Sequence, residues 1–265
     1  MSETIISRNK TVVVVGLILV GLFLIATSPL GKELMVKREP PETDNLFVLG
    51  QYYFNHGPHA DGTYDIELAR HYYELALADN PIGDNWAWYQ LGRIDFLEGK
   101  FDAAIYKFNK QIEFFEDQQP SVYYMLGLTY GYRARREGRE DDWTSAIEYF
   151  SRYLEHDNDS PWARVDLSWI YFSQGRFEEM KPILEVGLTT HNDNPWLLNM
   201  YGLALLNTGN KEEAESSFSA ALEAAKRLTP ENWGLSYPGN DPSAWSEGLE
   251  EFRSAIQANL DLAEL

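Results

Sequence analysis

The chain has 265 residues, a net charge of −19 and no cysteine. Hydrophobic residues make up 44% of it, which is enough to bury a core, so the composition excludes an intrinsically disordered chain. The acidic balance argues against nucleic-acid binding because such a surface repels phosphates, and the lack of cysteine excludes disulfides, thiolate metal sites and cysteine nucleophiles.

The N-terminal part of the chain predicts a membrane anchor. Residues 1–10 form a short polar tail, and residues 11–30 carry no charged side chain. A helix of 20 residues is roughly 30 Å long, which matches the hydrocarbon core of a bilayer. Ala26-Thr27-Ser28 resembles a signal-peptide cleavage site, but proline would follow the cut. We therefore predict an uncleaved transmembrane signal anchor, with a cleaved signal peptide as the alternative.

Residues 31–43 predict a linker between the anchor and the folded domain. They are charged and contain Pro40-Pro41, which favours an extended spacer. Two Lys or Arg residues precede the apolar stretch and three follow it, so the positive-inside rule does not fix the orientation. Because the N-terminal tail is net positive, we expect it in the cytoplasm and the domain outside the cytoplasm. The opposite orientation, with a cytoplasmic domain, stays open.

From residue 44 onward one pattern recurs five times. Each copy has a small residue in its first helix. In all copies but one, the second helix also has a small residue. An aromatic residue or leucine follows that position of the second helix four residues later. The small residues of the first helices are Gly50, Gly92, Gly127, Ser168 and Gly202. The corresponding positions of the second helices are Ala69, Ala104, Ala146, Met180 and Ala214, followed by Tyr73, Phe108, Phe150, Leu184 and Phe218. The period is 34 or 35 residues once two insertions of seven residues are removed.

This pattern resembles the tetratricopeptide repeat (TPR), whose consensus is W-x2-L-G-x2-Y, then A-x3-F, then P. Trp88, Leu91, Gly92, Ala104 and Phe108 match it in the second repeat. The lengthened repeats are also similar to Sel1-like repeats. The resemblance implies an all-α fold, a right-handed α-solenoid of about five helix pairs over residues 44–230. We expect the repeats at residues 43–81, 85–120, 120–160, 161–194 and 195–230.

The two insertions and one substitution depart from the consensus. Residues 55–62 in the first repeat contain glycine and proline, which predicts a loop. Residues 131–137 in the third repeat contain no proline and amount to nearly two helical turns, so they predict a longer first helix. Asp95 stands where an aromatic residue is expected.

The segment after Pro230 predicts the end of the array. Residues 231–242 are rich in glycine, proline and asparagine, which indicates a loop. Residues 243–265 show the apolar spacing of a second repeat helix, with Ser243 as the expected N-cap. We predict that this helix caps the open end of the solenoid.

The resemblance also implies a binding groove, because the first helices of TPR proteins line a concave face that binds partner segments. Exposed aromatic patches mark interaction sites, and aromatic residues dominate interface energies. We expect about half of the groove residues to be exposed and the rest to pack between repeats. By spacing, the groove residues are Phe47, Gln51, Phe54, Trp86, Tyr89, Arg93, Phe96, Tyr124, Leu128, Tyr132, Trp162, Val165, Trp169, Phe172, Trp196, Asn199 and Leu203.

A basic cluster lies in the second insertion and just after it. Two interpretations stay open: a patch that docks an acidic partner or lipid headgroups, and a solvated helix paired with neighbouring acids. The cluster consists of Arg133, Arg135, Arg136 and Arg139.

No motif predicts catalysis, a cofactor or a metal. His56, His59, Asp61 and Asp65 are the candidate metal ligands, but a metal site must hold three or four ligands in fixed geometry. A polar surface loop explains these residues better.

We predict a membrane-anchored scaffold or adaptor that binds a protein partner in a membrane or cell-envelope assembly. A receptor that captures a peptide or glycan is the alternative, because aromatic platforms also suit sugars.

Overall fold

The computed structural model describes residues 39–56, 64–81, 86–115, 119–234, 236, 239 and 241–265. Their regular structure is entirely helical, which confirms the all-α prediction. The predicted anchor at residues 11–30 and most of the linker lie outside the described residues. Within the described ranges, no helix combines the length and apolarity needed to cross a membrane.

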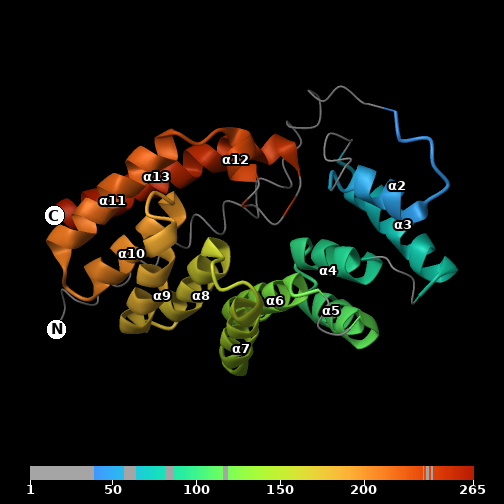
Figure 1. The fold of residues 1–265 in the computed structure, drawn as a ribbon, viewed down its shortest axis with the longest axis horizontal. Coiled ribbons are helices and arrows are strands. Elements are labelled where there is room, and N and C mark those ends of the chain that lie inside the picture. Colours follow the sequence, from blue (N-terminus) through green and yellow to red (C-terminus); the bar gives the residue numbers. More distant parts are fainter. Residues whose placement is uncertain are drawn as a thin grey trace.

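The described helices pack as five successive pairs in a curved array. Figure 1 shows α4, α6 and α8 on the inner side of the curve and α5, α7 and α9 on the outer side. Each pair falls within one expected repeat. The pairs are α2 (Leu46–Tyr53) with α3 (Ile66–Asp79), α4 (Ala87–Leu97) with α5 (Phe101–Phe115), α6 (Ser121–Glu137) with α7 (Asp141–His156), α8 (Pro161–Ser173) with α9 (Phe177–Thr190), and α10 (Pro195–Asn207) with α11 (Lys211–Lys226).

The two helices of a pair approach closely at the small residues of the repeat. A Cβ atom added at Gly92 would lie 2.6 Å from the Phe108 ring. At Gly202 it would lie 2.5 Å from the Phe218 ring. Both rings are fully buried. The small and aromatic residues that recur in the sequence therefore contact each other within these pairs.

Side chains and backbone conformation explain where helices begin and end. Gly99 follows α4 with a φ of 71°, the left-handed conformation that glycine adopts without steric cost. At the start of α8, the Ser160 hydroxyl accepts a hydrogen bond from the backbone N–H of Ala163. Asn194 caps α10 in the same way, accepting from the N–H groups of Trp196 and Leu197. Proline occupies the first position of both helices, where no hydrogen bond is lost.

The two insertions have different outcomes. In the third repeat, α6 continues to Glu137 over 17 residues, which confirms the longer first helix. In the first repeat, α2 ends at Tyr53, so the helix does not continue into the insertion. Residues 57–62 of that insertion lie outside the described residues.

The described part of the segment from 231 to 242, which was predicted to be a loop, includes helical residues. The helix α12 (Pro230–Gly234) begins directly after the last repeat, and a 3-10 turn follows at Pro242–Ala244. Trp233 of this short helix is buried, and a Cβ atom added at Gly248 would lie 2.3 Å from its ring. The prediction that Ser243 is the N-cap is also wrong. The capping side chain is that of Asp241, which accepts a hydrogen bond from the backbone N–H of Ser243.

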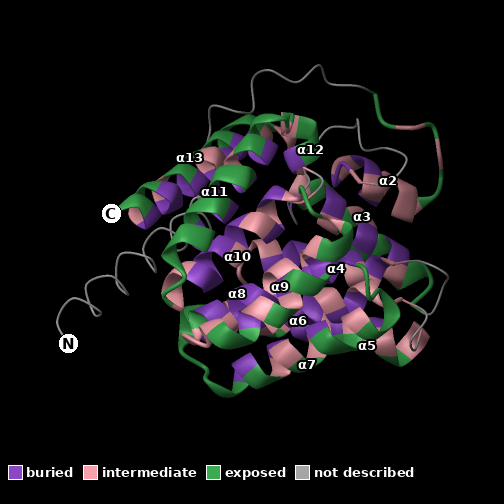
Figure 2. Cartoon of the chain, turned by 60° about the vertical axis from the view of Figure 1, so that its left-hand side comes forward, coloured by how far each residue is buried: buried purple, intermediate pink, exposed green. Residues whose placement is uncertain are grey.

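The helix α13 (Trp245–Glu264) covers the end of the array. It packs against α11 and α10, and the Phe252 ring stacks on Trp196 at 4.9 Å. Arg253 donates hydrogen bonds to the carbonyls of Ala225 and Leu228, near the end of α11. Figure 2 shows exposed residues along the outer sides of α11 and α13 and buried residues between neighbouring helices.

Candidate functional site

The predicted groove residues divide into a partly exposed group and a buried group, and none of them is fully exposed. The partly exposed residues are Phe47, Gln51, Trp86, Tyr89, Tyr124, Tyr132, Trp162, Val165 and Trp196. The buried residues are Phe54, Arg93, Phe96, Leu128, Trp169, Phe172, Asn199 and Leu203.

Contacts between repeats explain much of this burial. Tyr132 comes from the inserted part of α6, and its ring lies 5.2 Å from the Phe96 ring and 5.1 Å from the Trp169 ring. It therefore connects the second, third and fourth repeats. The insertion thus supplies an aromatic residue that covers two predicted groove residues.

Arg93 and Asn199 are buried for other reasons. The Arg93 guanidinium lies 4.9 Å from the centre of the Phe54 ring and donates to the Gln90 side chain at 3.1 Å. Its Nη1 atom is also 3.3 Å from His56 Nδ1, and burial together with this cation lowers the pKa of His56 to about 4. Asn199 accepts a hydrogen bond from Asn259 of α13 at 3.0 Å, so the capping helix covers it.

Asp95 replaces the expected aromatic residue with a buried ion-pair network. Its carboxylate is 2% exposed, accepts from Arg70 at 2.9 Å and contacts the Lys107 ammonium. Arg70 also donates to Glu98 at 2.7 Å. The network joins α3 of the first repeat to both helices of the second. Apart from the unusual acid itself, no signal in the sequence indicated this link.

A second carboxyl group lies beside the partly exposed Tyr124. Tyr124 donates a hydrogen bond to Asp166, and burial raises the pKa of Asp166 to about 7. Burial likewise raises the pKa of Tyr124. Asp166 is therefore protonated at mildly acidic pH, where an ordinary carboxyl group is ionised.

The basic cluster is not a single patch. Arg133 is buried and donates to Asp142 through Nε at 2.7 Å, and it also pairs with Asp102. It is therefore a structural ion pair and not a docking residue. Arg139 lies 2.9 Å from Glu137, as the solvated-helix interpretation expected. Arg135, Arg136 and Arg139 are exposed.

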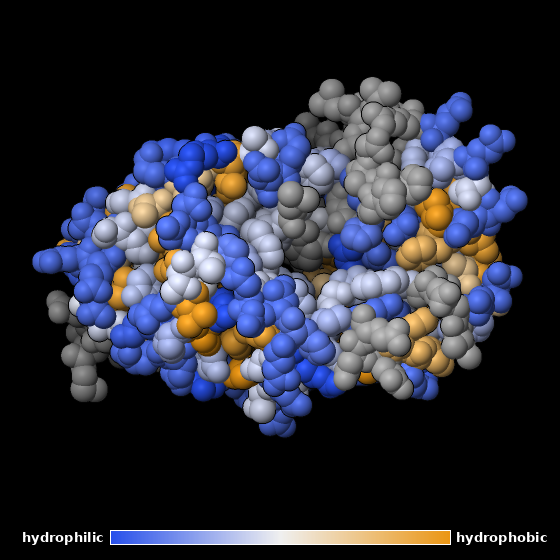
Figure 3. All heavy atoms as spheres, viewed as in Figure 1, coloured by the Kyte–Doolittle hydropathy of each residue, from blue (hydrophilic) through white to orange (hydrophobic). Residues whose placement is uncertain are grey.

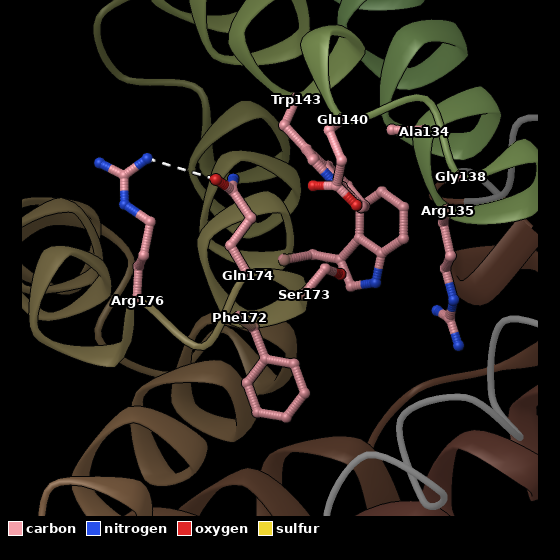
Figure 4. A pocket seen from close by; sticks show the side chains of 10 residues that line it. Ala134, Arg135, Gly138, Glu140, Trp143, Phe172, Ser173, Gln174 and Arg176 are labelled. Carbon is pink, nitrogen blue, oxygen red and sulfur yellow. Dashed lines mark hydrogen bonds between the residues drawn. The ribbon is translucent and has the colours of Figure 1, made fainter.

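A pocket of about 650 Å³ lies where α6 and α8 end, between two repeats. Figure 4 shows Arg135 and Arg176 on opposite sides of it, with Phe172 and Ser173 between them. The pocket combines buried predicted groove residues with one member of the predicted basic cluster. Its lining consists of Ala134, Arg135, Gly138, Glu140, Trp143, Trp169, Phe172, Ser173, Gln174 and Arg176.

Exposed apolar side chains also lie on α3. Leu68 and Leu75 lie seven residues apart on α3, about two turns, and both are exposed. Figure 3 shows apolar residues over α2 and α3 at that end of the array.

For metals, the described residues hold no group of three or more candidate ligands, and His59 lies outside them.

Family comparison identifies the repeats directly. The family model of a tetratricopeptide repeat matches residues 139–186, and a second model of the same repeat matches residues 197–227. The chain contains TPR repeats. The first match spans α7 to α9 and the second spans α10 and α11. The similarity to Sel1-like repeats rests on repeat length alone.

Solved structures show the same TPR fold at low sequence identity. PilW, a type IV pilus biogenesis factor, is 16% identical with a TM-score of 0.54, covering 83% of this chain and 97% of that one. A MamA protein is 19% identical with a TM-score of 0.52, covering 71% and 98%. TTC0263, a TPR protein of Thermus thermophilus, is 20% identical with a TM-score of 0.50, covering 61% and 84%. A search of curated proteins finds no match.

Proposed function

We propose that the chain is a membrane-anchored TPR scaffold that binds a protein partner along its inner face. The observation that carries this proposal is the row of partly exposed aromatic side chains on successive first helices, from Phe47 on α2 to Trp196 on α10. Removing apolar surface from water contributes roughly 25 cal/mol per Å², so these incompletely covered rings favour a bound partner. The proposal assigns the chain a binding role and no catalytic residue.

The membrane location is part of the same proposal. Residues 11–30 serve as the anchor, the N-terminal tail lies in the cytoplasm, and the partner belongs to a membrane or cell-envelope assembly. The support is the uncharged stretch of 20 residues and the charged linker that follows it. A chain that lacks residues 1–30 should leave the membrane fraction after high-speed sedimentation, whereas the full chain should resist extraction with alkaline carbonate. Retention of the shortened chain on membranes would refute the anchor.

Crosslinking in native membranes tests the binding face. A photo-reactive aromatic residue in place of Trp162, which is partly exposed on α8, should crosslink a defined partner protein. The matched control places the same residue at Tyr106, which is 57% exposed on the outer helix α5. A product from Trp162 alone supports the inner face. Identical products from both positions, or none from a folded and membrane-bound chain, would contradict the proposal.

A further inference from the structure

The pocket between the third and fourth repeats exists because α6 is long. The helix has 17 residues, compared with 13 in α8 and 13 in α10. Ala134 and Arg135, which line the pocket, belong to the seven inserted residues. The turn at Gly138, with a φ of 69°, then directs the chain into α7. A repeat without the insertion would lack this wall.

The walls are aromatic and contain an unused hydrogen-bond donor. Trp143, Trp169 and Phe172 line the pocket and are each at least nine-tenths buried. The indole N–H of Trp169 has no hydrogen-bond partner within the described part of the chain. A buried donor without a partner costs about 1–3 kcal/mol.

The charge at the pocket is opposite to that of the chain. The lining includes Arg135, Arg176 and Glu140, two cations against one anion, in a protein with a net charge of −19. Arg176 already pairs with Glu179 at 2.9 Å. Arg135 forms no ion pair with any described residue, and its guanidinium lies 5.9 Å from the centre of the Trp169 ring. It is therefore the cation that remains for a ligand carboxylate.

We propose that this pocket binds a peptide segment of the partner in which an aromatic side chain stands next to an aspartate or glutamate. The aromatic side chain enters between Trp143 and Phe172, and the carboxylate pairs with Arg135. A volume of about 650 Å³ lies in the usual range for ligand sites, roughly 300–1,000 Å³. This inference rests on the proposed function, because it names the partner segment that the inner face binds.

Selection from a displayed library of random short peptides tests the proposal with the full chain in detergent. Enriched peptides should share an aromatic residue beside an acid. Arg135→Glu should shift the selected neighbour from acidic to basic residues. Ser173→Trp should abolish enrichment, because this exposed residue lines the pocket and the larger side chain fills it. Lys211→Glu and Ser219→Trp change exposed residues on α11 in the same ways and should behave as wild type.

Fluorescence anisotropy with a synthetic consensus peptide gives the magnitude. Replacing the peptide's acid with alanine should weaken binding by about 10-fold to 100-fold, the range expected for a charge-assisted hydrogen bond. On Arg135→Glu the same change should strengthen binding, because it removes a like charge. Circular dichroism should show unchanged helicity for the variants at Arg135 and Ser173, since both residues are exposed.

Two other outcomes are distinguishable. If selected peptides bind Ser173→Trp and Arg135→Glu as well as wild type, but compete with the crosslink at Trp162, the pocket proposal fails and the scaffold proposal stands. If the library yields no peptide above background and the crosslink at Trp162 is also absent, both proposals fail.

Discussion

Replacing Asp95 with alanine should destabilise the junction between the first two repeats. The carboxylate is 2% exposed and lies between Arg70 and Lys107, which are 17% and 19% exposed. Removing one partner of a buried ion pair typically costs about 3–5 kcal/mol. Arg70 keeps Glu98 at 2.7 Å and both cations have some access to water, so we expect about 2–3 kcal/mol of unfolding free energy to be lost.

Urea unfolding followed by circular dichroism measures this loss, with hydrogen exchange to locate it. Stability in a repeat array is approximately the sum of repeats and their interfaces, so damage at one junction stays local. Amides of α2 and α3 should therefore lose protection in the variant. Amides of α10 and α11, far along the array, should exchange as in wild type.

A compensating variant separates the ion-pair network from a simple packing effect. Arg70→Met, Asp95→Leu and Lys107→Met together replace the network with apolar side chains, and such replacements are often neutral or stabilising. The triple variant should recover most of the lost stability. A loss below about 0.5 kcal/mol for Asp95→Ala, within the range of ordinary surface substitutions, would refute the reasoning. A triple variant as unstable as the single one would refute it as well.

Two further predictions concern packing and pH. Gly202→Ala places a methyl group 2.5 Å from the Phe218 ring, and it should cost about 1–3 kcal/mol in urea unfolding; adding Phe218→Leu should cost less than the two changes separately. Burial raises the pKa of Asp166 from 3.8 to about 7, so between these values the folded carboxyl keeps a proton that the unfolded chain releases, and stability falls as pH rises. Asp166→Asn should reduce that fall in the urea midpoint across this pH window, and an unchanged profile would contradict the assignment.

The contacts within each repeat could be predicted from the sequence. Gly202 and Phe218 are 16 residues apart, and each repeat presents its small and aromatic positions in the same order. Gly99 takes the left-handed conformation for an equally local reason, because it directly follows the end of the first helix of its repeat. Such contacts depend only on residues of one repeat, so a recurring pattern is enough to reveal them.

The contacts that decide exposure could not be predicted, because they come from elements outside the repeat consensus. Trp169 is buried by Tyr132 of the lengthened α6, and Asn199 is covered by Asn259 of α13. Spacing places both residues on the inner face, but it does not show what lies above them. Arg133 is buried in an ion pair with Asp142, which lies nine residues later on the next helix. The sequence predicted the length of the extension of α6, but not the residues that its side chains contact.

The position of α13 also constrains how the protein is made. Leu260 and Ala263 of this helix belong to the same buried cluster as Leu203. During synthesis the fifth repeat emerges before α13, because α13 follows it in the chain. Domains fold as the chain appears, N-terminal parts first, and transiently exposed apolar surface favours aggregation. The final repeat thus completes its buried core only after α13 has emerged. Premature termination before Trp245 would leave the apolar surface at the end of the array exposed, and the shortened chain would be prone to aggregation.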